Sequence, residues 1–514
     1  MQRWWALAGL VAALATPAWA QVRPPVDQRP DFSQMSRAEI RAVIRAMPKG
    51  GDLHIHLSGA PFAETYLDWA AEDGLCVDTA RWTLTDPCRP GGDLVAASGL
   101  TVDQRSLMID SLSTRRPGFA GRSGHDQFFS TFGRFDATPD HRRGDMLADL
   151  MATLAAQNTF YVEVMWMPQS GPARELGAVS GDGSNLAALD AAMALGMPAL
   201  VEAAMAETDA VEARAREVLG CSSPTDRAPG VSSWDPPGGC RVTVRHLVQA
   251  NRLIAPPQTY GQLALGDALI AADPRWVGVQ LVAPEDHADA LRNYRLHMEM
   301  IRHLIGRRMD LGGRLAAALH AGELTLDYAP PADMAFHVTG AVQAGALRIG
   351  HGLSIPSETA GHDLLDRMIA GGVAVEISLT SNADILGIEG QDHPVIWLRQ
   401  AGVPVIYTTD DPGISRSDLS NEYARAVFDT GATYEDLVTS ARNALAFSFL
   451  PGEGLWQDPG RYQQMVSACA GQMDGDATAS CQVLLGASPK AREQWAFEAR
   501  LANFERDWAA GHAL

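Results

Sequence analysis

Eight short runs of apolar residues, rich in β-branched side chains, recur through the middle of this 514-residue chain, and segments able to form helices lie between them. The candidate strands are Gly51–His56, Phe160–Met165, Val242–Val248, Val277–Val282, Leu315–His320, Leu347–His351, Val373–Leu379 and Val403–Thr409. Nearly continuous apolar strands that alternate with helices predict a parallel sheet covered on both faces. Eight such units predict that the sheet closes into an α/β fold of the (β/α)8 barrel type, which also suits the length of the chain.

The rest of the chain divides into segments before, within and after this barrel. We expect an N-terminal segment over 21–46, the barrel over 47–450, and a helical C-terminal extension over 451–514 that ends in the helix Pro489–Ala509. Two connections, near 76–122 and near 207–241, are longer than a barrel needs and rich in turn-forming residues. We interpret both connections as insertions.

The first residues have the pattern of a secretion signal. Arg3 gives a positive start, an apolar run covers Trp4–Leu14, and Ala18-Trp19-Ala20 places small residues where cleavage would occur. We therefore predict a signal peptide over 1–20, a mature protein that begins near Gln21, and a periplasmic or extracellular location. The alternative is an N-terminal helix buried in the folded protein. The apolar run is too short to span a bilayer.

Six cysteines fall into three pairs that are close in sequence, and none forms a C-x-x-C metal motif. The pairs are Cys76 with Cys88, Cys221 with Cys240, and Cys469 with Cys481. Six cysteines allow fifteen connectivities, so the sequence does not fix the pairing, although proximity favours the local one. Six free thiols are the alternative expected of a cytosolic protein.

The charge balance limits the kinds of partner. Acidic residues outnumber basic ones to give a formal net charge of −20. Nucleic acids and anionic membranes bind basic surfaces, so neither is an expected partner. A small neutral or cationic molecule fits this balance better.

Metal-binding or acid–base side chains stand at the carboxyl ends of four predicted strands, the face on which barrel enzymes keep their active sites. They are His54 and His56 on the first strand, His320 and Glu323 at the fifth, His351 at the sixth, and Asp410 and Asp411 after the eighth. Histidines two positions apart on a strand point the same way. Singly, each residue has a simpler interpretation, such as a surface or core histidine or a helix cap. Together they predict one site.

Zinc suits this set of side chains, because catalytic zinc sites combine imidazole and carboxylate ligands and leave a position for water. We expect His54, His56, His320 and Asp410 to hold one zinc ion per chain. Zinc would lower the pKa of a bound water to about 7. Glu323 would then be free to donate a proton, and His351 to hold or receive protons beside the attacking water.

Several motifs together resemble the signatures of the adenosine deaminase family, in the order the family has them. The motifs are Met47-Pro48-Lys49, His54-Ile55-His56-Leu57, His320-Ala321-Gly322-Glu323, Arg348-Ile349-Gly350-His351-Gly352, Thr380-Ser381-Asn382 and Thr409-Asp410-Asp411-Pro412. The resemblance implies a hydrolase that deaminates adenosine-type 6-aminopurine nucleosides. It also implies the zinc ligands and catalytic residues named above, with Asp411 beside purine N7, and a mechanism in which Glu323 protonates purine N1 while the activated water attacks C6.

The same resemblance assigns the remaining substrate contacts. Phe128 and Phe132 are four residues apart, share a helix face, and resemble the family's hydrophobic gate over the ribose; plain core packing would explain their spacing equally well. Ser58 stands where the family often has an aspartate that contacts the ribose, and Ala283 where it has a glycine whose amide meets purine N3. Both departures therefore predict weaker contacts to the sugar and to the N3 edge of the purine. Export and cysteine-bearing insertions are similar to the extracellular growth-factor branch of the family, which leaves room for a homodimer, although that branch's N-terminal dimerisation arm is not evident.

Two other classes of function remain open. Another barrel amidohydrolase, such as an adenine or modified-adenosine deaminase, would share these ligands, but many such enzymes bridge a second metal with a lysine that Val277–Val282 lacks. A secreted, non-enzymatic binding protein on the same barrel would be expected to have lost a ligand or the acid, and none is lost. Ammonia release from adenosine, with and without a chelator, discriminates among the three.

Overall fold

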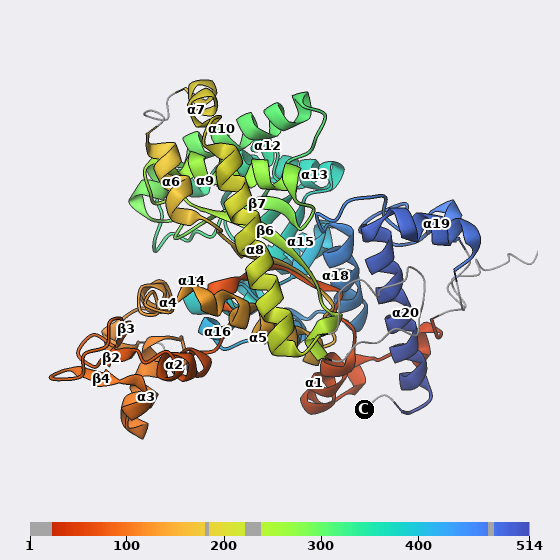
Figure 1. Cartoon of the computed structure of the whole chain (residues 1–514). Coiled ribbons are helices and arrows are strands. Elements are labelled where there is room, and N and C mark those ends of the chain that lie inside the picture. The colour runs from red at the N-terminus through yellow and green to blue at the C-terminus, as the bar shows by residue number, and fades with distance from the viewer. Residues whose placement is uncertain (1–22, 117, 180–184, 222–237, 471–476, 513–514) are drawn as a thin grey trace, which may run out of the picture.

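The computed structural model describes residues 23–512, except 117, 180–184, 222–237 and 471–476. The predicted signal peptide, 1–20, lies outside the described residues. Eight parallel strands stand at the centre of the molecule (Figure 1). In barrel order they are β1 (Gly51–His56), β5 (Tyr161–Trp166), β6 (Thr243–Asn251), β7 (Trp276–Val282), β8 (Ala318–Ala321), β9 (Arg348–His351), β10 (Ala374–Ile377) and β11 (Val405–Tyr407).

Two single backbone bridges close these strands into a ring. β1 to β7 form one four-stranded parallel sheet, and β8 to β11 form the other. Val279 of β7 bridges Ala317 before β8, and Ile55 of β1 bridges Asp410 after β11. The (β/α)8 barrel predicted from the eight apolar runs is therefore confirmed, because every run overlaps one of these strands.

Helices cover the outside of the ring. They are α1 (Arg37–Ala46), α2 (Ala63–Glu72), α4 (Gly124–Phe132), α5 (Arg143–Ala156), α6 (Ser170–Ala178), α7 (Leu186–Met193), α8 (Met197–Leu219), α9 (Pro256–Ala272), α10 (Ala288–Asp310), α11 (Pro331–Met334), α12 (His337–Ala344), α13 (His362–Gly371), α14 (Leu379–Leu386), α15 (Val395–Ala401), α16 (Pro412–Ser415), α17 (Leu419–Thr430) and α18 (Tyr434–Ala446). Local chemistry sets their ends: α1 begins at a capping box in which Ser36 and Glu39 bond each other's backbone amides, and α8 ends at the left-handed Gly220.

The first insertion carries a small sheet of its own. β2 (Cys76–Asp78) pairs antiparallel with both β3 (Thr83–Thr85) and β4 (Leu94–Ala96), and α3 (Val102–Ser111) follows. These elements project to one side of the barrel together with α2 (Figure 1). A disulfide between Cys76 and Cys88 ties β2 to the loop after β3.

Helix α8 continues to Leu219, so the first part of the connection predicted near 207–241 is helical. Val211 and Ala215 recur there at helical spacing and are buried. Pro224, Pro229, Pro236 and Pro237 lie outside the described residues. Within the described chain no single helix is long and apolar enough to cross a membrane, although α7 and α8, bent by 74°, together pass the same test of length and composition.

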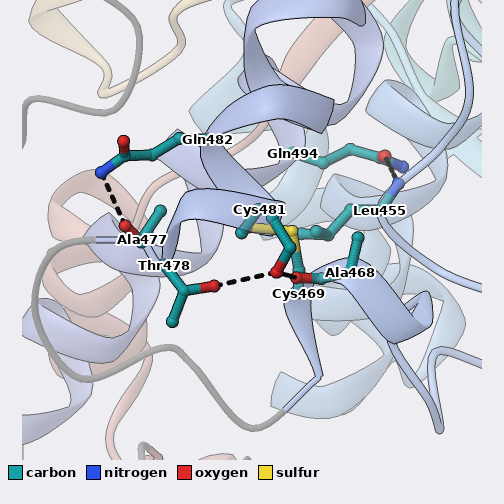
Figure 2. The surroundings of a disulfide bond; sticks show 9 residues. Leu455, Ala468, Cys469, Ala477, Thr478, Cys481, Gln482 and Gln494 are labelled. Atoms are coloured by element: carbon teal, nitrogen blue, oxygen red, sulfur yellow. Dashed lines mark hydrogen bonds between the residues drawn. A yellow bond between two sulfur atoms is a disulfide. The ribbon is translucent and has the colours of Figure 1, made fainter.

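The C-terminal extension ends in α19 (Ala479–Ala487) and α20 (Pro489–Ala509), which matches the predicted final helix. A disulfide joins Cys469 to Cys481 of α19, and beside it Gln494 of α20 accepts a hydrogen bond from the amide of Leu455 (Figure 2). Arg442 of α18 pairs with Glu498 of α20 and so links the extension to the barrel. With the third bridge, Cys221 to Cys240, the predicted local pairing of all six cysteines is confirmed.

Candidate active site

Four of the predicted metal ligands meet at the carboxyl end of the barrel. The nitrogen and oxygen atoms that His54, His56, His320 and Asp410 offer lie within 4.8 Å of one another, and all four side chains are buried. His54 Nε2 is 3.0 Å from His320 Nε2 and 3.4 Å from Asp410 Oδ1. His56 Nε2 is 3.3 Å from the same Asp410 oxygen.

The opposite nitrogen of each histidine faces an oxygen. His54 Nδ1 lies 2.8 Å from Glu376 Oε2, His56 Nδ1 lies 2.9 Å from Gln249 Oε1, and His320 Nδ1 lies 2.8 Å from the carbonyl of Leu281. A carbonyl or carboxylate oxygen only accepts, so each Nδ1 donates. Each neutral imidazole then keeps a lone pair on Nε2.

Three lone pairs and a carboxylate oxygen that point at one another repel unless a cation lies between them. This arrangement therefore fits a metal ion, and histidines that ligate metals characteristically donate their other nitrogen to an oxygen in this way. The donor set of three nitrogens and one oxygen suits zinc. The described structure thus contains a buried His/Asp group able to hold a metal.

Glu323 and His351 lie next to this group. Their side chains and Asp410 also form a cluster within 4.8 Å, with His351 Nε2 3.6 Å from Glu323 Oε1. Burial, reinforced by the Asp410 carboxylate, raises the pKa of Glu323 well above its usual range. Glu285 accepts hydrogen bonds from the amides of Gly322 and Glu323 and so fixes the turn that carries the acid.

The backbone of the site adopts strained conformations. Ala283, His351 and Asp410, each at or just past a strand end, have φ of 85°, 67° and 62°. Residues other than glycine adopt this left-handed region uncommonly, and surrounding structure must enforce it. Here the sharp turn lets a side chain leave the strand direction and face the barrel mouth.

Asp411 follows at the same strand end. Its carboxyl is buried, its Oδ1 has no hydrogen-bond partner among the described residues, and burial raises its pKa to about 8. A Cβ on Gly59 would stand only 1.5 Å from that oxygen, so the glycine makes room for it. This unpaired oxygen faces the turn after β1, close to the His/Asp group.

The residues predicted to bind substrate lie around the same mouth. Ser58 is half-buried in the turn after β1, and its carbonyl accepts a hydrogen bond from Tyr66. Ala283 follows β7, and its carbonyl accepts a hydrogen bond from Arg252. Phe128 is buried and Phe132 half-buried on α4, with ring centroids 5.6 Å apart.

Helix α4 lies at the catalytic end because it packs on α14, the helix after β10. Its Gly124 approaches α14 so closely that a Cβ would lie 1.9 Å from the carbonyl of Asp384. His125 of α4 reaches further: it stacks on Tyr328, with centroids 4.3 Å apart, and lies 3.1 Å from Asp286. Tyr328 and Asp286 belong to the connections after β8 and β7, so this contact closes one side of the mouth.

The residues that orient the site were assigned no role from the sequence, although Asn382 stands in one of the quoted motifs. Glu376, Gln249, Glu285, Asn382 and His393 all bond to a candidate ligand, to a catalytic residue or to each other. The available signal was a charged or amide side chain within, or directly after, an otherwise apolar strand, as with Glu376 in Val373–Leu379. Such a side chain cannot be buried alone, because an unpaired charge is costly.

The fold is a (β/α)8 barrel, and its mouth carries a buried His/Asp group able to hold a metal ion. Residues 237–455 match the family model described as adenosine deaminase. An adenosine deaminase of Shewanella loihica is 33% identical over 140 residues, which are 26% of this chain and 38% of that protein. An N6-methyl-AMP deaminase of Danio rerio is 34% identical over 107 residues, which are 20% of this chain and 30% of that protein. Over these residues the chain is similar to the adenosine deaminase family.

A solved structure extends the likeness to most of the fold. The crystal structure of the N6-mAMP deaminase of arabidopsis covers 79% of this chain and 95% of that chain, with a TM-score of 0.50 and 20% identity. At this identity the match concerns the barrel architecture. The two sequence alignments span well under half the length of the curated relatives.

Proposed function

We propose that this protein is a zinc-dependent aminohydrolase that converts adenosine-type 6-aminopurine nucleosides and water into 6-oxopurine nucleosides and ammonia. The observation that carries the proposal is the cluster at the barrel mouth. A three-histidine, one-aspartate donor group lies beside a buried carboxyl, Glu323, and a buried imidazole, His351. The donor group could hold the metal, while Glu323 and His351 could donate or hold protons beside it.

The mechanism assigns each residue one task. Zinc held by His54, His56, His320 and Asp410 would supply Lewis acidity and lower the pKa of a water to about 7. Glu323, kept protonated by burial, donates its proton to purine N1 and makes C6 electrophilic. His351 holds the attacking oxygen in place. The oxygen adds to C6, and its remaining proton passes to the 6-amino group, which leaves as ammonia. The other proton of the water returns Glu323 to its acid form, and the ring keeps N1–H and gains a 6-oxo group.

The remaining residues around the mouth would bind the nucleoside. Asp411 faces purine N7, and Phe128 and Phe132 cover the sugar from α4. Relatives of this chain bear the names of adenosine and N6-methyl-AMP deaminases, so family members differ in the substituents they accept. Ser58 and Ala283 sit where such differences at the sugar and at the N3 edge would be read.

An exported location fits the chemistry of the cysteines. All six are paired in three local disulfides, and such bonds persist in oxidising compartments. We extend the proposal to a signal peptide over 1–20, a barrel unit over 47–450, and an extension over 451–514. The substrate is then a small molecule that reaches the protein outside the cytoplasm.

Ammonia release tests the function directly. We expect purified protein to release ammonia from adenosine, to lose this activity with a chelator and to regain it with zinc. Glu323→Gln should retain metal but lose about 10²–10⁴-fold in kcat, because an amide cannot protonate N1. No release from adenosine, 2′-deoxyadenosine or adenine by zinc-loaded protein would overturn the proposal.

A further inference from the structure

A line of buried polar groups leads from the imidazole of His351 to a backbone amide of α15. His351 Nδ1 lies 2.9 Å from Asn382 Nδ2, and Asn382 Oδ1 lies 3.0 Å from His393 Nε2. His393 Nδ1 accepts a hydrogen bond of 3.1 Å from the amide of Val395. His351, Asn382 and His393 are each at most 1% exposed. The line starts at β9, crosses α14 and ends at the first residue of α15.

The direction of every hydrogen bond in this line follows from its last member. A backbone N–H can only donate, so His393 Nδ1 must carry a lone pair and His393 Nε2 the proton. That N–H requires an acceptor, which must be the oxygen of the Asn382 amide. The amide nitrogen is therefore turned towards His351 and donates to Nδ1. His351, as a neutral imidazole, then carries its proton on Nε2.

We propose that Asn382 and His393 are positioning residues that hold His351 in the tautomer with its proton on Nε2, so that His351 presents an N–H donor to the reaction space. His351 Nε2 is the atom of this line without a hydrogen-bond partner in the described structure, and it lies 3.6 Å from Glu323 Oε1. Which atom receives this N–H rests on the proposed deaminase function. In that reaction it is the attacking oxygen.

The line keeps its polarity over a wide range of pH. Burial, together with the neighbouring imidazole of His351 and the positive charges of Arg425 and Arg399, lowers the pKa of His393 to about 3. His393 therefore stays neutral, and a neutral ring with one fixed donor and one fixed acceptor cannot reverse the line. An imidazolium at this position would donate from both nitrogens and would clash with the Val395 amide.

Asn382→Asp changes one atom of the line. A carboxylate cannot donate to His351 Nδ1 and instead accepts a hydrogen bond from it, which favours the tautomer of His351 with its proton on Nδ1 in place of Nε2. The readout is nitrogen NMR of zinc-loaded protein labelled with ¹⁵N-histidine, with the His351 signals assigned by their loss in His351→Gln. We expect a single Nε2–H tautomer in the unchanged protein and protonated Nδ1 in Asn382→Asp. Turnover should fall by about 10²–10⁴-fold in kcat with KM and zinc content unchanged.

A matched pair at His393 separates positioning from mere packing. His393→Gln can still donate an N–H to Asn382 Oδ1, whereas His393→Phe fills the space but donates nothing. We expect the glutamine to restore the single tautomer and most of kcat, and the phenylalanine to yield mixed tautomers and low kcat. A protonated Nδ1 in the unchanged protein, or equal spectra for the two variants, would overturn the proposal. The NMR result is independent of the substrate, so failure of the deaminase assay alone leaves this assignment standing.

Discussion

Glu376 joins two parts of the barrel interior that would otherwise be separate. One carboxylate oxygen accepts from His54 Nδ1 at 2.8 Å, and the other pairs with the buried guanidinium of Arg348. Arg348 in turn pairs with Glu163 at 2.6 Å, so a line of buried charges crosses the barrel and ends on His54, a candidate metal ligand. Buried charges are tolerated only when they are paired in this way. The ring of His54 is thus held by the same ion pairs that fill the barrel core.

Replacing Glu376 by glutamine tests this connection. The amide accepts less strongly from His54 Nδ1, and the metal loses the added basicity of the imidazole, so we expect metal affinity to fall by about 10–100-fold. Competition with a chromogenic chelator measures the affinity. Glu163→Gln is the matched control, because it removes a charge from the same line of buried ion pairs without contacting a histidine. Equal losses of affinity in both variants would show that the effect is one of general stability.

Ser58 offers a second test at the scale of one residue. A serine carries no charge, so the proposed contact to the sugar is weaker than that of the aspartate often found there in the family. We expect adenosine and 5′-deoxyadenosine to have similar kcat/KM, because a site without the polar partner does not discriminate strongly against a missing hydroxyl. Ser58→Asp should shift the ratio towards adenosine. A steep preference for adenosine in the unchanged protein would mean that another residue binds the hydroxyl.

At the scale of elements, hydrogen bonds from α14 to a carboxyl of α17 fix the first turn of α14. Glu422 of α17 accepts hydrogen bonds from the amide and the hydroxyl of Thr380, at the first turn of α14, and from Ser417. The two residues that follow Thr380 are Ser381, which bonds Asp410 at 2.7 Å, and Asn382, which bonds His351. The position of both therefore depends on a carboxyl that belongs to a neighbouring helix.

This carboxyl should make stability depend on pH. Burial raises the pKa of Glu422 from 4.5 to about 7, so the folded state favours the protonated form. Its contribution is therefore complete below pH 4.5 and is lost as the pH rises through 7, by about 3 kcal/mol in all. Denaturant unfolding at pH 5 and pH 8 should show a smaller difference for Glu422→Gln than for the unchanged protein. Glu389→Gln, at an exposed partner of Arg425, should not change it.

Helices and strands were predictable from the sequence where apolar residues recur in a regular pattern. Site residues were predictable where they stand at the end of a predicted strand. The eight barrel strands lie in clear apolar runs and α20 has an apolar pattern, whereas β2, β3 and β4 are short and flanked by turn-forming and polar residues. His54, His320 and Asp410 stand at strand ends and were visible. Asn382 and His393 were not assigned a role, because only the folded chain brings them to His351.

On the scale of the whole molecule, segments far apart in sequence hold the barrel together. Arg23, near the start of the described chain, lies between Glu505 of α20 and Glu435 of α18. The metal group has the same character, since its four ligands come from the first, fifth and eighth strands. A bound ion would therefore fasten opposite sides of the ring.

Removal of the metal should lower thermal stability. A ligand that binds only the folded state adds about 2.7 kcal/mol at a concentration of 100 times its Kd. We expect a chelator to lower the melting temperature and zinc to restore it, as followed by calorimetry. His56→Ala, which lacks a ligand, should melt lower and respond less to the chelator. An unchanged melting temperature in both proteins would argue against a structural contribution of the ion.

The spacing of the cysteines has a consequence for how the chain becomes oxidised. Paired cysteines are 12, 19 and 12 residues apart, whereas a bond between neighbouring pairs would close a loop roughly ten times as long. The difference in loop-closure entropy favours each correct bond by about 2 kcal/mol in the unfolded chain. Correct bonds can thus form in any order, before the barrel exists, and wrong ones are rare enough that little reshuffling is required. The same preference for short loops would act on a chain that emerges residue by residue, because the three pairs would become complete one after another.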